Sequence, residues 1–352
     1  MGGNALSEET IRLPASRYRE IENSILERIR DMLPGVRAEA IAAYADKPDF
    51  GDMDILVAEH ADFEPIALSQ KLAAKEIVRN GEVTSFGLPV SEGVFQVDLI
   101  GVPAASFDFA MRYFSYNDLG NLLGRVAHKF GAKFGHLGLL YPLRDPGNDD
   151  HLLAELTVTT DFSAALAMLG YDAQAYETLR RKDGFRALED IFRYVVSSPY
   201  ANPAIYLLEN RSYRARVRDA KRPAYNKFLD WLATQEPGSL PVYPWGEAGS
   251  QERQAQRRNF LDMAFERFPA FKQSYDGALA RAERQHRAKR YFNGEFVASI
   301  SGLTGKELGM LMSRIRSTFA SNDELEGFFA TAAEDEARAR IRSAVDSAHD
   351  DE

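Results

Sequence analysis

The chain has 352 residues and a formal net charge of −9, with 45% hydrophobic and 27% charged residues. This composition is ordinary for globular domains and excludes a fibrous or wholly disordered protein. The absence of cysteine excludes disulfide scaffolds, thiolate zinc sites and cysteine nucleophiles, but a hard-metal site built from carboxylates stays open. No apolar run reaches the ~18 residues of a membrane span, and the N-terminus lacks the pattern of a secretory signal. We therefore expect a cytoplasmic protein with no membrane partner.

The first 150 residues mix helical and strand patterns. Apolar spacings of three and four predict helices over residues 12–33, 66–79 and 103–132. Short apolar or alternating runs predict strands at residues 40–45, 54–58, 83–90, 93–102 and 134–143. This mixture predicts an α+β domain in which helices flank a mixed sheet.

Helical patterns dominate from about residue 160 to the end of the chain. The run 237–250, rich in Pro and Gly, is the strongest linker candidate. Residues 251–292 predict a long polar helix or a helix pair, and residues 292–315 two short helices around a glycine-rich turn. An excess of acids near the end predicts a tail that is either a frayed helix or disordered. The predicted domains are thus 1–150, 151–240 and 250–330, followed by an acidic tail at 331–352.

Three aspartates stand out because each lies in or beside an apolar β-like run. Asp52 and Asp54 are separated by one residue, so both side chains face the same side of a strand. Asp98 is a lone acid in a second such run. If the two strands are neighbours in the sheet, the three carboxylates converge. Aspartates at strand starts also serve as turn residues, and this alternative stays open for the first pair.

Converging carboxylates suit Mg²⁺, which prefers oxygen ligands and keeps water and substrate phosphates in its shell. Two ions about 3.5–4 Å apart can clamp the attacking and leaving oxygens of a phosphoryl group. Asp52, Asp54 and Asp98 are therefore the predicted catalytic and metal-binding residues, with two Mg²⁺ ions or Mn²⁺ in their place.

The order of these motifs resembles the family X DNA polymerases, typified by DNA polymerase beta. Gly51-Asp52-Met53-Asp54 matches the segment that holds the first two metal ligands, and Asp98 matches the third acid. Tyr113-Phe114 matches the family's Tyr-Phe element. The resemblance covers residues 12–145 and implies a nucleotidyltransferase palm, followed here by a mainly helical C-terminal region.

The resemblance also implies a set of nucleotide-binding residues. The Tyr-Phe pair would form an apolar wall against a sugar, and an Asn on the following helix offers donors and an acceptor to a base edge. An Arg on that helix can stack or hold a phosphate. The candidates are Lys47, Gly51, Tyr113, Phe114, Asp118, Asn121 and Arg125.

The sequence departs from the family where the triphosphate would bind. Ala42 and Ala43 stand in place of the family's Gly-Ser, and no arginine lies between Arg37 and Asp52. The backbone at Gly51 and the side chain of Lys47 are the candidate substitutes, so the departure puts triphosphate affinity in question.

The C-terminal half carries basic clusters and a second resemblance. Residues 292–315 are similar to an element of bacterial-type CCA-adding and poly(A)-adding nucleotidyltransferases, with Lys306 in a glycine turn that opens a helix. Basic residues recur at helical spacing beside aromatic ones, which is typical of nucleic-acid binding but equally of solvated helix faces. The candidate nucleic-acid-binding residues are Arg214, Arg218, Arg222, Arg287, Arg290 and Lys306.

These observations together predict a metal-dependent nucleotidyltransferase that moves a nucleoside monophosphate from a nucleoside triphosphate to a 3′-hydroxyl of DNA or RNA. Two alternatives stay open. The acceptor could be a protein or a small molecule, or the chain could be a nucleic-acid-binding protein that has lost activity, as the altered phosphate-binding segment would allow.

Overall fold

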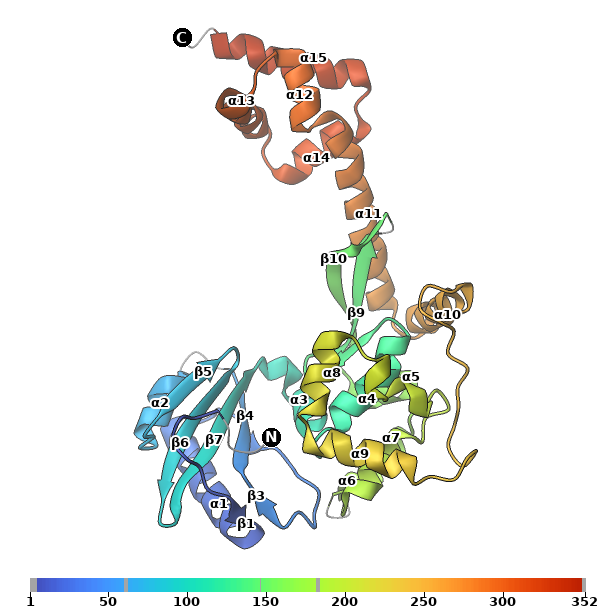
Figure 1. Ribbon diagram of the computed structural model, residues 1–352. Helices are drawn as coiled ribbons and strands as arrows, with labels where there is room; N and C mark the ends of the chain where they lie inside the picture. Colours follow the sequence, from blue (N-terminus) through green and yellow to red (C-terminus); the bar gives the residue numbers. More distant parts are fainter. Residues whose placement is uncertain (1–4, 60–62, 146, 182–183, 350–352) are drawn as a thin grey trace. The chain divides into compact units, whose positions relative to one another are not determined.

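The computed structural model describes residues 5–59, 63–145, 147–181 and 184–349 (Figure 1). The chain forms two compact units. Unit 1 contains Met1–Pro142 and Thr157–Phe271, and unit 2 contains Leu143–Leu156 and Lys272–Glu352. The two units do not test the predicted domain boundaries at residues 150, 240 and 330, which stay predictions.

Unit 1 is built on a mixed five-stranded sheet. β4 and β7 run parallel at its centre, and every other neighbouring pair is antiparallel. The strand order is β2 (Ala38–Ala40), β4 (Asp52–Ala58), β7 (Gly93–Val102), β6 (Val83–Val90) and β5 (Ile77–Asn80). Strands β6 and β7 form the predicted hairpin with the predicted boundaries.

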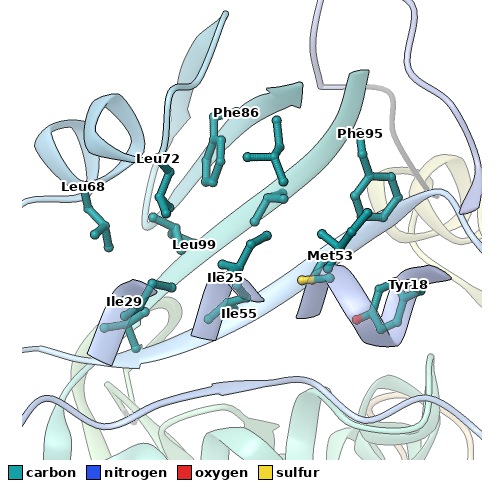
Figure 2. Packing of buried hydrophobic residues seen from close by; sticks show 14 of the residues in the cluster. Tyr18, Ile25, Ile29, Met53, Ile55, Leu68, Leu72, Phe86, Phe95 and Leu99 are labelled. Atoms are coloured by element: carbon teal, nitrogen blue, oxygen red, sulfur yellow. The ribbon is translucent and has the colours of Figure 1, made fainter. Parts of the chain in front are cut away.

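One face of this sheet is covered by α1 (Ala15–Met32) and α2 (Pro65–Lys71) (Figure 1). The buried residues of α1 recur every three or four positions, so a single stripe of the helix meets the sheet. Figure 2 shows Ile25 and Ile29 packed beside Met53 and Ile55 of β4 and Leu99 of β7. This packing fixes which side chains of β4 and β7 point away from the core.

The opposite face carries a smaller apolar cluster and the acids. Leu56 of β4 and Ile100 of β7 pack there with Phe107 and Ala110 of α3 (Phe107–Phe114). Because strand side chains alternate, Asp52, Asp54 and Asp98 also point to this second face.

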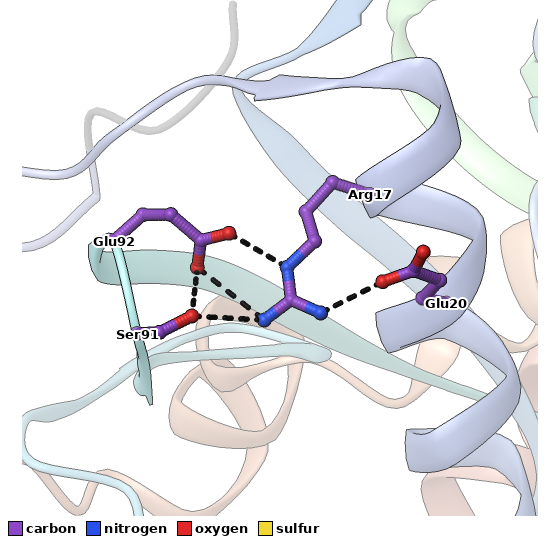
Figure 3. Close-up of polar contacts among 4 residues, drawn as sticks. All are labelled: Arg17, Glu20, Ser91 and Glu92. Atoms are coloured by element: carbon purple, nitrogen blue, oxygen red, sulfur yellow. Dashed lines mark hydrogen bonds and ion pairs between the residues drawn. The ribbon is translucent and has the colours of Figure 1, made fainter.

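An ion-pair network ties the start of α1 to the β6–β7 hairpin (Figure 3). Arg17 donates from Nε to Glu92 at 2.7 Å and from Nη2 to Ser91 at 3.1 Å, and its Nη1 pairs with Glu20 at 2.8 Å. All four side chains are near the surface, so the network orients α1 more than it stabilises it. Close by, β1 (Leu13–Pro14) pairs with β3 (Asp49–Phe50).

The remainder of unit 1 is mainly helical. Its α-helices are α4 (Leu119–Lys129), α5 (Phe162–Met168), α6 (Ala173–Arg181), α7 (Leu188–Val195), α8 (Tyr213–Ala220), α9 (Pro223–Ala233) and α10 (Gln251–Arg267). Three 3₁₀ turns lie at Ala104–Ser106, Pro203–Ile205 and Leu208–Asn210. A second, three-stranded sheet consists of β8 (Lys133–Gly135), β9 (Gly138–Asp145) and β10 (Asn148–Thr159). The part of β9 and β10 within Leu143–Leu156 belongs to unit 2.

The predicted linker at 237–250 has no helix or strand but is fastened along its length. Tyr243 donates its backbone N–H to the carbonyl of Ala201 at 2.9 Å, and the Trp245 indole donates to the carbonyl of Tyr200 at 3.0 Å. The Trp245 ring also packs against Phe130. The run is therefore an ordered part of unit 1.

Unit 2 contains most of α11 (Pro269–Tyr291) and a four-helix core. The helices are α12 (Gly294–Ser301), α13 (Gly305–Ser317), α14 (Asn322–Thr331) and α15 (Glu334–His349). Of the two predicted states of the tail, a frayed helix or a disordered segment, the structure shows a helix over Glu334–His349, and α15 buries Ala337, Ile341 and Ala344 in this core. These residues share one helix face, and the acids that dominated the prediction lie on the others.

Three other element predictions need correction. The 40–45 run is a strand only as far as Ala40, and the region 66–79 divides into α2 and β5. The strand β10 was missed because its alternating pattern is interrupted by two leucines in succession. The predicted helix pair over 251–292 is confirmed as α10 and α11.

The predicted fold class is confirmed. The chain is α+β, with a mixed sheet, flanking helices and a mainly helical C-terminal region. Among the residues that the structure describes, no helix combines the length and apolar character that a membrane crossing requires.

Candidate functional site

A polar cavity of about 430 Å³ opens on the acidic face of the sheet. Its walls come from the start of α1, the segment before β4, the start of β4, the end of α3 and the junction of α8 and α9. The charged and amide side chains that line it are Arg12, Lys47, Asp52, Asp54, Asn117, Asp118 and Arg222. Three carboxylates, three cations and one amide thus line the same cavity.

The sheet register places the three predicted acids on one face. Asp52 and Asp54 are two residues apart in β4, and Asp54 lies directly beside Asp98 in the parallel pairing of β4 with β7. Asp52 and Asp54 line the cavity. Asp98 is 8% exposed and is not part of the cavity lining.

Burial and mutual repulsion perturb this acid group. Burial raises the pKa of Asp54 to about 8, and the charges of Asp52 and Asp98 act in the same direction. Burial likewise raises the pKa of Asp98 to about 6, while hydrogen bonds from Ser85 and Gln96 oppose the rise. A carboxyl that is hard to ionise beside a second carboxylate is a site where a cation would be stabilising.

Asp98 is held by its neighbours in the sheet. The Gln96 amide donates to both carboxylate oxygens at 3.0 Å, and the Gln96 carbonyl oxygen accepts the Ala5 N–H at 3.0 Å. Gln96 lies two residues before Asp98 and therefore on the same face of β7. This hydrogen bonding occupies the oxygens that Asp98 would offer to a metal ion.

The donor set fits a hard cation at Asp52 and Asp54. Both are carboxylates at a cavity with room for water and phosphate oxygens, the shell that Mg²⁺ prefers. Over the residues that the structure describes, however, no group of three or more His, Cys, Asp or Glu side chains is placed to hold a metal ion. Asp98 could join the pair only by giving up at least one Gln96 contact.

Three cations surround the two acids. The Lys47 ammonium lies 4.2 Å from the centre of the Phe50 ring, and burial lowers its pKa while Asp52 and Asp54 act to raise it. Arg12 pairs with Asp49. Arg222, which follows α8, pairs with Asp118 across 104 positions of sequence. The charge of Lys47 thus interacts with both Asp52 and Asp54.

The Ala42-Ala43 segment also lines the cavity. Hydrogen bonds hold its flanks, because the Ile41 N–H donates to the Asp54 carbonyl at 2.9 Å and the Ala42 carbonyl accepts the Tyr116 N–H at 2.7 Å. Within the described chain the N–H groups of Ala42 and Ala43 donate no hydrogen bond. Their backbone amides are therefore candidate donors to an anion even without Gly-Ser.

The turn after α3 brings a residue to the cavity that the sequence reasoning missed. Tyr116 and Asn117 both adopt left-handed backbone conformations, with φ of 61° and 62°. Tyr116 is buried against Phe185, whereas Asn117 lines the cavity. Consecutive left-handed residues other than glycine are uncommon and are typical of functional turns.

The predicted nucleotide-binding residues divide into two groups. Lys47, Gly51, Phe114 and Asp118 line the cavity. The other three do not line it: Tyr113, Asn121 and Arg125. Tyr113 packs against Phe134 and His136, and the Asn121 Nδ2 and Arg125 Nε atoms are buried without a hydrogen-bond partner in the described structure.

The predicted nucleic-acid-binding residues fall in both units. Arg222 lines the cavity, and Arg214 and Arg218 are exposed on α8. Arg287 and Arg290 are exposed on α11, and Lys306 is exposed on α13, all in unit 2.

Sequence reasoning missed Arg12, Tyr18, Asn117 and Gln96. No local signal marks Arg12 or Tyr18, which belong to a helix and its approach far from the acids in sequence. Gln96 could have been found, because a polar residue two positions before a lone strand acid must share its face.

Comparisons with known proteins add little to this geometry. No protein-family model matches the sequence, and no curated protein matches it significantly. One similar solved structure is the polymerase beta of Leishmania infantum in a ternary complex described as P/T, with 13% sequence identity and a TM-score of 0.35. The match covers 46% of this chain and 73% of that one. A likeness of this strength does not identify the reaction, which has to be inferred from the residues of the cavity.

Proposed function

We propose that the chain is a metal-dependent nucleotidyltransferase that moves a nucleoside monophosphate from a nucleoside triphosphate to a 3′-hydroxyl of nucleic acid. The observation that carries this proposal is the cavity itself. It places the Asp52 and Asp54 carboxylates beside Lys47, with Arg12 and Arg222 on its walls. Paired carboxylates suit a divalent cation, and surrounding cations suit a polyphosphate.

In the proposed reaction the acceptor 3′-oxygen attacks the α-phosphorus as the bond to the β-phosphate oxygen breaks. Pyrophosphate leaves, and the hydroxyl proton passes to solvent. Bound Mg²⁺ or Mn²⁺ would supply charge neutralisation for the phosphoryl oxygens and the leaving group. Asp52 and Asp54 would hold this cation, and Asp98 would join them only by giving up a Gln96 contact.

The triphosphate would lie against the cationic wall. Lys47 is a candidate partner for its negative charge, and the N–H groups of Ala42 and Ala43 could supply backbone donors. Phe114 and Asn117 offer an apolar surface and an amide to the nucleoside. No side-chain nucleophile is needed, since the attack is direct.

One assay tests the proposal. The purified chain is offered the four ribonucleotides and the four deoxynucleotides with single-stranded, duplex and tRNA acceptors, with Mg²⁺ or Mn²⁺. We expect metal-dependent lengthening of an oligonucleotide with release of pyrophosphate, and loss of both in Asp54→Asn. The proposal is wrong if no nucleotide is transferred, or if Asp54→Asn transfers as fast as the unsubstituted chain.

A second candidate is a nucleic-acid-binding protein without turnover. The observation that favours it is the Gln96 amide, which occupies both oxygens of Asp98. This candidate predicts salt-dependent binding of oligonucleotides with no pyrophosphate release under any metal. A transferase for a protein or small-molecule acceptor predicts pyrophosphate release without oligonucleotide lengthening.

A further inference from the structure

Helix α8 is almost wholly exposed. Of its eight residues, Tyr213–Ala220, only Asp219 is buried. The helix contacts α9 and the 3₁₀ turn Leu208–Asn210 before it. A helix with so little buried surface gains little stability from packing, so its exposed face has no evident structural role within unit 1.

The exposed face of α8 carries an aromatic ring. Tyr213 is 72% exposed and Val217, one turn later on the same face, is 41% exposed. The Arg216 guanidinium lies 5.9 Å from the Tyr213 ring centre. A ring held open beside a cation presents one π-face that a planar ligand can cover.

The same helix is strongly cationic. Arg214, Arg216 and Arg218 are exposed along it, and Lys221 is exposed just beyond it. Within the described residues, Arg214, Arg216 and Lys221 take part in no ion pair. The single acid of the helix, Asp219, is buried. This uncompensated positive charge contrasts with the net charge of −9 of the whole chain.

A buried ion pair anchors the helix. Arg211 and Asp219 pair at 2.6 Å with side-chain exposures of 2% and 0%, and Arg218 Nε donates to the same carboxylate at 3.0 Å. The Arg211 guanidinium also lies 6.0 Å from the centre of the buried Tyr225 ring. The buried Arg211–Asp219 pair therefore fixes the backbone of α8, from which the exposed side chains project.

The C-terminal end of α8 reaches the cavity. Arg222 lies three residues after Asp219 and lines it. Burial raises the pKa of Tyr113 on α3, and the charges of Arg222 and Arg218 oppose this rise, so both cations lie near that ring. A chain that crosses α8 would thus arrive at the rim of the proposed active site.

We propose that α8 is the docking surface for a single-stranded nucleic-acid end. An unpaired base stacks on Tyr213, and Arg214, Arg216 and Arg218 hold the phosphates that flank it. A single strand is favoured over a duplex because only an unpaired base exposes its face to an aromatic ring. The assignment of this strand as the acceptor rests on the proposed function.

The test is fluorescence anisotropy of a labelled single strand of about ten nucleotides, near the site sizes typical of such surfaces. We expect Tyr213→Ala to weaken binding roughly tenfold, the scale of one lost base stack, and Tyr213→Phe to retain it. Arg214→Ala and Arg216→Ala should each reduce the slope of log affinity against log salt by about one. Arg193→Ala is the control, since it removes the same charge from a different helix, α7, where the Arg193 side chain is 70% exposed.

Equal binding by Tyr213→Ala and the unsubstituted chain overturns the proposal. So does a duplex that binds as tightly as the single strand, or an acidic peptide that competes with it on equal terms. Tyr213 is so exposed that Tyr213→Ala should keep its fold, which circular dichroism checks.

The two proposals fail in distinguishable ways. Asp54→Asn should abolish transfer and leave binding of the oligonucleotide intact, whereas Tyr213→Ala should weaken oligonucleotide binding and leave nucleotide affinity intact. Strand binding that depends on Tyr213 in a chain without transfer would overturn the proposed function and support the α8 surface. Transfer that is insensitive to Tyr213→Ala at low oligonucleotide concentration would support the proposed function and overturn the α8 surface.

Discussion

Asp54 of β4 lies directly beside Asp98 of β7 in a parallel strand pair, and both carboxyl groups point away from the α1 core. The two acids nevertheless have different surroundings. Asp54 lines the cavity, whereas Asp98 lies outside the lining and accepts two hydrogen bonds from the Gln96 amide. Asp98 could therefore reach a bound metal ion only by giving up a contact with Gln96.

Replacement of either acid should impair transfer. We expect Asp54→Asn and Asp98→Asn each to lower the rate by at least about 10²-fold, the scale for removing one preorganised electrostatic group. The measurement is initial rate at saturating nucleotide with thermal unfolding as a check on folding. Glu82→Gln, a change on the exposed β5–β6 turn, is the charge-matched control. Activity in Asp98→Asn with none in Asp54→Asn would exclude Asp98 as a ligand.

Stability without metal should fall as the pH rises. Burial raises the pKa of Asp54 to about 8 from its ordinary 3.8, so between these values the folded chain binds more protons than the unfolded chain. The contribution of the protonated Asp54 carboxyl to the free energy of unfolding is complete below about pH 4 and is lost as the pH rises through about 8. Each unit of pKa difference corresponds to about 1.4 kcal/mol. Thermal unfolding from pH 5 to pH 9 measures the effect.

The matched variant for this pH effect is Asp54→Asn, which should flatten the dependence and unfold at a higher temperature than the parent at pH 9. Added Mg²⁺ should raise the unfolding temperature of the parent most at high pH, where the carboxylate is ionised and ready to bind. If the unfolding temperature of the parent is constant from pH 5 to pH 9, the pKa of Asp54 is not raised in the folded chain.

Lys47 should govern nucleotide affinity. Its ammonium lies in the cavity beside the acids, and no arginine lies between Arg37 and Asp52 in the sequence. We expect Lys47→Ala to raise the KM for the nucleotide roughly tenfold with a smaller change in kcat, because a charge-assisted contact contributes ~1.5–3 kcal/mol. Lys75→Ala removes an equal charge that pairs with Glu8 outside the cavity and should leave the KM unchanged.

The local parts of the fold were predictable because their patterns are short in range. The alternation in residues 83–90 and 93–102 defines β6 and β7, and the four-residue spacing of isoleucines defines α1. The shared face of Asp52 and Asp54 follows from the same alternation. Their closeness to Asp98 needed one further fact, that β4 and β7 are neighbours, which no local pattern contains.

The cavity wall could not be predicted for the same reason. Arg222 reaches Asp118 across 104 positions, and Arg12 arrives from the approach to α1. Both are ordinary surface arginines in the sequence. Conversely, the resemblance implied that Tyr113 and Asn121 contact the nucleotide, but neither residue lines the cavity.

The buried Arg211–Asp219 pair should dominate the stability of the α8 region. Arg211→Ala leaves the Asp219 carboxylate buried with only Arg218 as a partner, and we expect a loss of about 3 kcal/mol in the free energy of unfolding. Arg218→Ala removes a half-exposed partner of the same carboxylate and should cost at most about 1 kcal/mol. Chemical denaturation measures both. Equal losses in the two variants would contradict this ranking.

Two glycines should respond in opposite directions to the same methyl group. A Cβ at Gly120 in α4 would lie 2.2 Å from the Tyr113 carbonyl oxygen, so α3 and α4 would have to separate. We expect Gly120→Ala to destabilise the fold by about 1–3 kcal/mol, the usual cost of overpacking.

At Gly309 in α13 the added Cβ meets nothing within 4 Å and the backbone is helical. Gly309→Ala should therefore stabilise the chain by about 0.5–1 kcal/mol, because alanine loses less backbone freedom than glycine when a helix forms. Denaturant midpoints of the two variants against the parent test the pair. A stabilised Gly120→Ala would show that α3 and α4 do not approach as closely as the structure has them. The position of the turn between these helices, which carries Asn117 to the cavity, would then also be wrong.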